Sequence, residues 1–202
     1  MNVVLVDTNW EAFLPVTYTR PVSHLRCGIL KLYEKWEKLL NAYSVSVSEE
    51  YLNNKFFEEV EGTTLIVNSK VLPNRNLINA IEQLKDKEIL TSGKMWLAIR
   101  SEGGFDRDKW KHAEPIIYSD EYTTIESWWD LYKQNGFEIE KDFAIITKGR
   151  NSKALSASNT LVGPLSKVFI EESAYIEGCV LNTNSGSIYI GKKSEVMEGS
   201  CI

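Results

Sequence analysis

Residues 3–36 read "VVLVDTNWEAFLPVTYTRPVSHLRCGILKLYEKW" and set out a strand, a loop and a helix in that order. The run 3–6 is short and fully apolar, which is typical of a buried parallel strand. From Leu25 onward the apolar residues recur at intervals of four and three, which predicts an amphipathic helix. The loop between strand and helix carries Arg20 and Arg26, where an α/β protein usually holds a phosphate.

Strand and helix patterns continue to alternate as far as about residue 148. Thr123 and Glu126 form the pattern of a capping box that begins a helix, and Asn135-Gly136 is expected to end it. The predicted helices cover 77–84 and 124–134, and the predicted strands cover 43–48, 65–67, 88–100 with a turn at Ser92-Gly93, 115–120 and 142–147. This alternation favours an α/β architecture with a largely parallel sheet.

The overall composition excludes several classes of protein. The chain has 202 residues and a formal net charge of −5 without a basic tract, so we expect no nucleic-acid partner. No stretch approaches the ~20 apolar residues that span a bilayer, and the N-terminal residues do not resemble a signal peptide. Two histidines and three separated cysteines argue against a His-rich metal site, a zinc site and a disulfide framework. We expect a cytoplasmic protein with no membrane partner.

The residue composition and the spacing of apolar residues change after residue 150. Residues 151–162 are rich in Ser, Asn and Lys and low in apolar residues, which predicts a linker. Over 163–202, aliphatic residues recur every six positions with small residues between them, at Ile170 and Ile176 and again at Ile190, Val196 and Ile202. This period is typical of hexapeptide β-helix repeats, and the longer gap between the two sets predicts two extra residues. A pair of ordinary β-hairpins is the alternative.

Four blocks of the sequence together resemble a known family: "LPVTYTRPVSHLRCGILKLYEKWEKLL", "LIVNSKVLPN", "WWDLYKQNGFEIEKDFAII" and "GSIYIGKKSEVMEGSCI". The chain is similar to divergent bacterial (Bacteroidetes-type) sugar nucleotidyltransferase-like proteins, which are related to the bifunctional UDP-N-acetylglucosamine pyrophosphorylase/glucosamine-1-phosphate acetyltransferases. The resemblance implies a Rossmann-like, GT-A-like nucleotidyltransferase domain with a mixed sheet over 1–150. It also implies the linker 151–162 and the start of a left-handed β-helix over 163–202.

The resemblance carries further expectations about assembly. Because the sequence ends at the anchor position Ile202, we expect a longer parent protein, or a partner that covers this end. In the family the β-helix forms homotrimers and binds acetyl-CoA. Residues 168–202 amount to less than two turns, so we expect no complete acetyltransferase site here. The biological context that the resemblance implies is cell-envelope biosynthesis with sugar nucleotides such as UDP-N-acetylglucosamine.

Two departures from the family pattern affect the predicted site. No glycine lies between Val6 and Pro15, so the usual amide cradle for phosphates is missing, and Arg20 stands about where the family has a lysine. Where the family has an aspartate that binds Mg²⁺, this chain has Asn68-Ser69-Lys70. The candidate catalytic residues are Arg20 and Arg26, and the candidate nucleotide- or substrate-binding residues are Thr17, Arg20, Arg26, Gly28, Asn68 and Lys70.

Each of these candidates has a purely structural alternative. Arg20 and Arg26 are as easily explained by ion pairs with neighbouring carboxylates, and Thr17 by packing of the loop. The resemblance implies Mg²⁺ as a cofactor. Asp7 and Asp120 both follow predicted strands and are the candidate metal ligands, although turn formation explains them equally well.

Two functions follow from the resemblance. The first is a sugar-1-phosphate nucleotidyltransferase, whose partners are a nucleoside triphosphate, such as UTP or dTTP, and a sugar phosphate. The second is a catalytically degenerate module that binds a sugar nucleotide, or serves in assembly, without turnover.

Overall fold

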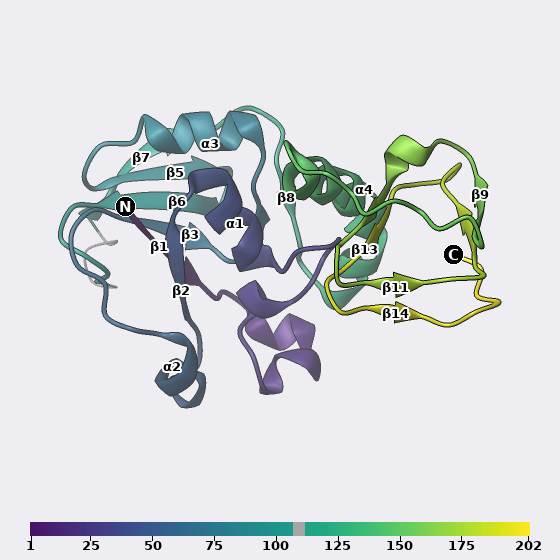
Figure 1. Ribbon diagram of the computed structural model, residues 1–202. Helices are drawn as coiled ribbons and strands as arrows, with labels where there is room; N and C mark the ends of the chain where they lie inside the picture. The colour runs from purple at the N-terminus through teal and green to yellow at the C-terminus, as the bar shows by residue number, and fades with distance from the viewer. Residues whose placement is uncertain (107–111) are drawn as a thin grey trace. The chain divides into compact units, whose positions relative to one another are not determined.

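The structure is a computed structural model that describes residues 1–106 and 112–202 (Figure 1). The chain forms two compact units, unit 1 from Met1 to Lys133 and unit 2 from Gln134 to Ile202. Unit 1 contains a six-stranded sheet and three α-helices, whereas unit 2 contains short parallel strand pairs. The helix α4 (Trp128–Thr147) includes the division between them.

The sheet of unit 1 is mixed, with the strand order β2-β1-β3-β6-β5-β7. β1 pairs in parallel with β2 and β3, β5 pairs in parallel with β7, and β6 runs antiparallel to both of its neighbours. The strands are β1 (Asn2–Val6), β2 (Tyr43–Val47), β3 (Thr64–Asn68), β5 (Glu88–Ser92), β6 (Met95–Ser101) and β7 (Glu114–Ile117). The predicted strands of 3–6, 43–48, 65–67 and 88–100 are therefore confirmed, whereas the strand predicted at 115–120 already ends at Ile117.

The central strands bury side chains on both faces, which explains their nearly continuous apolar sequences. Alternate residues enter different clusters because successive side chains point to opposite faces. Val3 and Leu5 of β1 belong to one cluster, and Val4 and Val6 belong to the other. The apolar runs that were read from the sequence thus specify a sheet that is covered on both sides.

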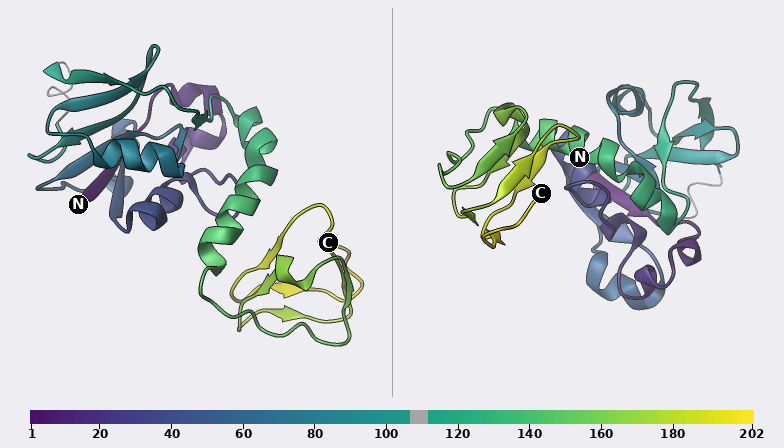
Figure 2. Two further views of the ribbon diagram at one scale, coloured as in Figure 1. Left: turned by 90° about the horizontal axis from the view of Figure 1, so that it is seen from above. Right: turned by 90° about the vertical axis from the view of Figure 1, so that its right-hand side faces the viewer.

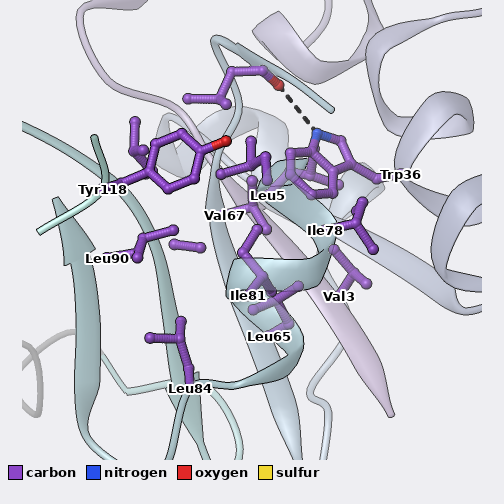
Figure 3. Close-up of a cluster of buried hydrophobic side chains, with 14 residues drawn as sticks. Val3, Leu5, Trp36, Leu65, Val67, Ile78, Ile81, Leu84, Leu90 and Tyr118 are labelled. Atoms are coloured by element: carbon purple, nitrogen blue, oxygen red, sulfur yellow. Dashed lines mark hydrogen bonds between the residues drawn. The ribbon is translucent and has the colours of Figure 1, made fainter. Parts of the chain in front are cut away.

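Helices α1 (Leu32–Leu40) and α3 (Arg75–Glu82) cover one face of the sheet. Trp36 of α1 is fully buried there, and its indole Nε1 donates a hydrogen bond to the Val71 carbonyl at 3.1 Å (Figure 3). Ile78 and Ile81 of α3 pack into the same cluster (Figure 3). A buried indole needs such an acceptor, so this bond fixes how α1 sits on the sheet.

Shorter elements complete unit 1. Helix α2 (Glu50–Phe56) follows β2, and the strands β4 (Val71–Leu72) and β8 (Thr123–Thr124) form a separate antiparallel pair. The loop between β1 and α1 contains three single-turn 3₁₀ helices, η1 (Trp10–Phe13), η2 (Val16–Tyr18) and η3 (Val22–His24).

The predicted helix from Leu25 begins too early. The structure places its first residue at Leu32, and residues 25–32 form a tight turn instead, with a hydrogen bond from the Leu32 amide to the Leu25 carbonyl at 3.0 Å. Gly28 in this turn has φ = +86°, a conformation that disfavours side chains and breaks a helix. Leu25 and Leu32 share a buried cluster with Phe13, so tertiary packing satisfies the apolar spacing that resembled a helix.

The prediction of a strand at 142–147 is wrong, because these residues belong to α4. Asn135 and Gly136 do not end this helix: the backbone of Gly136 faces open space, where glycine costs only about 1 kcal/mol. The helix ends at Thr147, and Gly149 follows with φ = +70°, as in a glycine C-cap.

The predicted capping box at Thr123 is also wrong. Thr123 lies in β8, and α4 begins at Trp128. At this end Asp130 Oδ2 accepts hydrogen bonds from the Glu126 and Ser127 amides, both at 3.0 Å.

Unit 2 consists of short strands that pair in parallel about twenty positions apart (Figure 2). Val168 pairs with Ile188, Tyr175 with Glu195, and Thr160 with Val180. The elements are β9 (Thr160–Val162), η5 (Leu165–Lys167), β10 (Val168–Ile170), β11 (Tyr175–Ile176), β12 (Val180–Asn182), β13 (Ile188–Ile190) and β14 (Glu195–Val196).

The predicted anchors of unit 2 differ in burial. Ile170, Ile176 and Ile190 are buried in one cluster and Val196 packs against it, whereas Ile202 is exposed. The whole predicted linker 151–162 lies within unit 2, where residues 160–162 form β9 and the Lys153 amide donates to the Ile170 carbonyl at 2.8 Å. The compact division at 133/134 and the predicted boundary at 150 lie at different positions, and the boundary stays a prediction.

Candidate functional site

The candidate site lies where β1, β2 and β3 end. Their parallel register places Val6, Val47 and Asn68 side by side, so the next residues of the three strands meet at one edge. Carboxyl ends of parallel strands are where open α/β sheets bind ligands. The long loop between β1 and α1 starts at this edge with Asp7.

Asp7 holds this edge together. Its Oδ2 accepts hydrogen bonds from Ser48 Oγ at 2.6 Å and from the Val22 amide at 2.9 Å, and its Oδ1 accepts one from Ser69 Oγ at 2.7 Å. Burial raises the pKa of the Asp7 carboxyl, while the bonds from Ser48 and Ser69 oppose that shift. The carboxylate therefore connects the ends of three strands to the loop. We call the four residues Asp7, Val22, Ser48 and Ser69 the strand-end knot.

A second contact docks the same part of the loop. Ser23, in η3, lies 2.7 Å from Ser46 through the two hydroxyl oxygens, and both side chains are buried. Together with the Val22 bond to Asp7, it fixes the segment that immediately follows Arg20.

The two candidates at the end of β3, Asn68 and Lys70, make hydrogen bonds and an ion pair with other residues of the protein. Asn68 Oδ1 accepts from Thr8 Oγ1 at 3.1 Å and from the Lys70 amide at 3.2 Å, and its Nδ2 donates to the Trp96 carbonyl. The Lys70 side chain is 8% exposed, and its Nζ lies 2.6 Å from Glu126 Oε2. The charge of Lys70 is thus balanced by a residue that is distant in the sequence.

The candidates in the loop divide into buried and exposed residues. Thr17 is buried, and its hydroxyl donates to the Trp10 carbonyl at 2.9 Å, which fits its structural alternative. Arg20 and Arg26 are both exposed, and the Arg26 guanidinium donates to the Ile29 carbonyl. Arg26 and Gly28 lie in the tight turn before α1, not at the helix N-terminus as expected.

Sequence reasoning missed a group of aromatic and basic side chains beside this loop. The His24 ring centroid lies 4.5 Å from that of Tyr33 and 4.6 Å from that of Phe56. Lys31 Nζ lies 5.5 Å from the Tyr33 centroid, and Lys55 Nζ lies 5.2 Å from the Phe56 centroid. The proximity of α2 to the loop carries no local signal, and it is α2 that contributes Lys55 and Phe56.

Unit 2 contains a cavity of about 450 Å³ with a mixed polar and apolar lining, beside Arg150 and Lys153. The Arg150 Nη2 contacts both carboxylate oxygens of Glu171, at 2.8 and 2.7 Å, and Lys153 Nζ donates to the Ala174 carbonyl at 2.9 Å. Because both cations already have partners in the fold, this cavity is a weaker candidate for an anionic ligand than the edge of the sheet.

A family model described as sugar nucleotidyl transferase matches residues 3–151, well over half of the chain. The chain belongs to this sugar nucleotidyl transferase family. The match covers the mixed sheet and the loop with Arg20 and Arg26, so the predicted relationship to sugar nucleotidyltransferases is confirmed. No curated protein matches the chain. No helix among the described residues is both long and apolar enough to cross a bilayer.

The residues of this sugar nucleotidyl transferase do not fit the Mg²⁺ ion that the fold family implies. Mg²⁺ prefers carboxylate oxygens, but both oxygens of Asp7 accept hydrogen bonds within the knot. Asp120 follows β7, which lies four strand positions from β1, and its side chain is exposed. At the end of β3 the ammonium group of Lys70 is paired with Glu126. In the described part of the chain, no three His, Cys, Asp or Glu side chains gather into a possible metal site.

Proposed function

We propose that this chain transfers a nucleotidyl group from a nucleoside triphosphate to a sugar 1-phosphate. A phosphate oxygen of the sugar phosphate attacks the α-phosphorus, the bond from that phosphorus to the bridging oxygen breaks, and pyrophosphate leaves. The observation that carries the proposal is the family match over the unit whose β1 loop presents Arg20 and Arg26.

The proposed role of the arginines follows from their charge and exposure. Negative charge accumulates on the departing pyrophosphate, and fixed guanidinium groups stabilise such charge. The knot at Asp7 supports this role, because it anchors Val22, two residues beyond Arg20, to the strand ends. A phosphate at this edge would therefore meet a cation whose backbone is held in place.

Release of pyrophosphate tests the proposal directly. The chain is incubated with UTP or dTTP and a panel of sugar 1-phosphates, with Mg²⁺ or with EDTA. We expect turnover that Arg20→Ala reduces at least tenfold and that Lys85→Ala leaves unchanged, because exposed Lys85 precedes β5 at the opposite edge of the sheet. Turnover that is equal in the wild type and in Arg20→Ala would reject the role of the arginine.

A second candidate is a module that binds a sugar nucleotide without turnover. Two observations favour it: Lys70 is neutralised by Glu126, and the Asp7 carboxylate is engaged within the knot. This function predicts that UTP or UDP-sugars bind while no pyrophosphate appears with any sugar phosphate, whereas turnover sensitive to Arg20→Ala contradicts it.

For unit 2 we propose the start of a hexapeptide β-helix, as in the bifunctional pyrophosphorylase/acetyltransferases. The parallel pairing of residues twenty apart supports it, because three hexapeptides plus the two predicted extra residues give that spacing. A crystal structure in which β10 and β13 pair as antiparallel hairpins would reject it. The homotrimer and the acetyl-CoA site of a longer parent stay predictions.

A further inference from the structure

The ring cluster beside the β1 loop lies in a strongly cationic environment. Burial, together with the charges of Lys31, Arg20 and Lys55, lowers the pKa of His24 from 6.5 to about 4, while the charge of Glu34 opposes this shift. Three cations from two separate segments are therefore close enough to act on one ring. His24 itself is neutral at pH 7 and adds no charge to this set.

Two exposed tyrosines lie on the same loop and on the same helix α2 that contribute His24 and Phe56 to the ring cluster. Tyr18 is 57% exposed and Tyr51 is 55% exposed, and the Tyr51 hydroxyl donates to the Tyr18 carbonyl at 3.0 Å. This bond joins α2 to the loop. We call the whole set the aromatic–basic surface, and it comprises Tyr18, Arg20, His24, Lys31, Tyr33, Tyr51, Lys55 and Phe56.

Each exposed tyrosine has a cation close by in the sequence. Tyr51 and Lys55 are four residues apart on α2, so their side chains lie on the same face of that helix. Tyr18 and Arg20 are two residues apart in the loop. The loop and α2 thus each contribute one exposed aromatic ring and one positive charge to the surface.

We infer that the aromatic–basic surface binds the nucleoside triphosphate, an inference that rests on the proposed function. The base stacks on the exposed rings of Tyr18 and Tyr51. The phosphates contact Arg20, Lys31 and Lys55. Every nucleobase has a π-face for stacking, and three cations suit the charge of a triphosphate.

The carboxylate nearest to this surface does not oppose the inference. Glu34 Oε2 accepts a hydrogen bond from the Lys31 amide at 2.6 Å, so that carboxylate belongs to the first turn of α1. The strand-end knot offers no comparable surface, because its charged groups are engaged within the fold. Phosphate binding is therefore assigned to the side chains of the loop and of α2.

The charge contribution is tested with two ligands and a matched control. Binding of UTP and of inorganic pyrophosphate is measured by isothermal titration, with Mg²⁺ and with EDTA, for the wild type and for the double variant Lys31→Gln/Lys55→Gln. We expect about a tenfold or larger loss of affinity for both ligands. Lys38→Gln, an exposed lysine in the last turn of α1, should bind both ligands as the wild type does.

The ring contribution is tested with a matched pair of exposed tyrosines. Tyr51→Ala should weaken UTP about tenfold and leave pyrophosphate unchanged, because only the nucleotide has a base to stack. Tyr43 is 59% exposed at the amino end of β2, so Tyr43→Ala should bind both ligands normally.

The outcomes separate this inference from the proposed function. UTP binding that neither the lysine variant nor Tyr51→Ala weakens would overturn the assignment of the surface and leave the proposed function in place. If the wild type binds neither UTP nor pyrophosphate and releases no pyrophosphate in the turnover assay, both fail together. A loss for the lysine variant without a loss for Tyr51→Ala would overturn the stacking role of the ring.

Discussion

The strand-end knot and the aromatic–basic surface lie at the same edge of the sheet but use their polar groups in opposite ways. In the knot, Asp7 accepts hydrogen bonds from buried Ser48 and Ser69, and nearby Lys70 is paired with Glu126. In the aromatic–basic surface, Arg20 is exposed and two tyrosines face solvent. The knot therefore stabilises the loop, and the surface offers charge and rings to a ligand.

This difference shows that position in a motif does not determine the use of a side chain. Asp7, Asn68 and Lys70 lie at or just after the ends of β1 and β3, where the resemblance predicts a site, yet their polar atoms are engaged within the protein. A carboxylate that is hydrogen-bonded by hydroxyls and an amide is well placed to stabilise a fold. Variants that remove one group at a time can test this division of roles, beginning with the change expected to have the largest effect.

Removal of the central carboxylate should break the knot. Asp7→Ala leaves the hydroxyls of Ser48 and Ser69 and the amide of Val22 without their acceptor, so we expect a loss of about 3 kcal/mol in the free energy of unfolding. Urea unfolding measures it, and exposed Asp120→Ala should change the free energy by less than about 0.5 kcal/mol. Equal midpoints for the two variants would contradict the structural role of Asp7.

The second test concerns the ion pair beside the knot. Glu126→Gln leaves Lys70, which is 8% exposed, without its countercharge. Because Glu126 is 48% exposed and partly screened by water, we expect a loss of about 2 kcal/mol rather than that of a fully buried pair. Lys70→Met in the same background should restore part of the loss, and exposed Glu121→Gln is the control. If the double variant Glu126→Gln/Lys70→Met is less stable than Glu126→Gln alone, then Lys70 stabilises the fold through a contact other than its pair with Glu126.

The third test concerns His24 of the aromatic–basic surface and depends on pH. The pKa of His24 is lowered to about 4 from 6.5, so between these values the unfolded chain binds more protons than the folded one. Stability should therefore fall as the pH falls from 6.5 to 4. Because His24 is only partly buried and solvent screens its charge, we expect it to account for about 1–2 kcal/mol of that fall, less than the full shift would give.

The variant His24→Phe isolates this contribution. It keeps a ring between Tyr33 and Phe56 but has no proton to bind, so its free energy of unfolding should depend less on pH in this interval. Urea unfolding of both proteins at pH 7, 5.5 and 4.5 provides the measurement. Parallel curves for the wild type and the variant would show that His24 keeps an ordinary pKa.

Most of the sheet could be predicted from the sequence because its signal is local. The apolar run at 3–6 and the turn after Ser92 each specify their elements within a few residues. The start of α1 and the extent of α4 could not be predicted in this way. Leu25 packs in a buried cluster with Phe13, and Gly136 lies inside α4, where a single glycine costs only about 1 kcal/mol.

For the candidate site, the sequence could predict only where the β1 loop begins. A loop with two arginines after the first strand must start at the edge where β1 ends, since connectivity alone places it there. The partners of its residues come from distant segments: Glu126 for Lys70, and Phe56 of α2 for His24. These pairings depend on how the strands and helices pack, so no short sequence pattern contains them.

The last test compares a variant of the aromatic–basic surface, for which we expect the smallest change in stability, with a variant of the strand-end knot. Arg20 is exposed, so Arg20→Ala should alter the free energy of unfolding by less than about 0.5 kcal/mol. The same variant should bind UTP about tenfold more weakly, with a smaller dependence on salt, because one charge facing the phosphates is lost. Asp7→Asn keeps one carbonyl oxygen as an acceptor and should show the reverse, with lower stability and nearly normal affinity at temperatures where it is folded. If Arg20→Ala instead destabilises the fold as much as Asp7→Asn does, then Arg20 belongs with the knot, and only the lysines and rings of the aromatic–basic surface remain to meet a ligand.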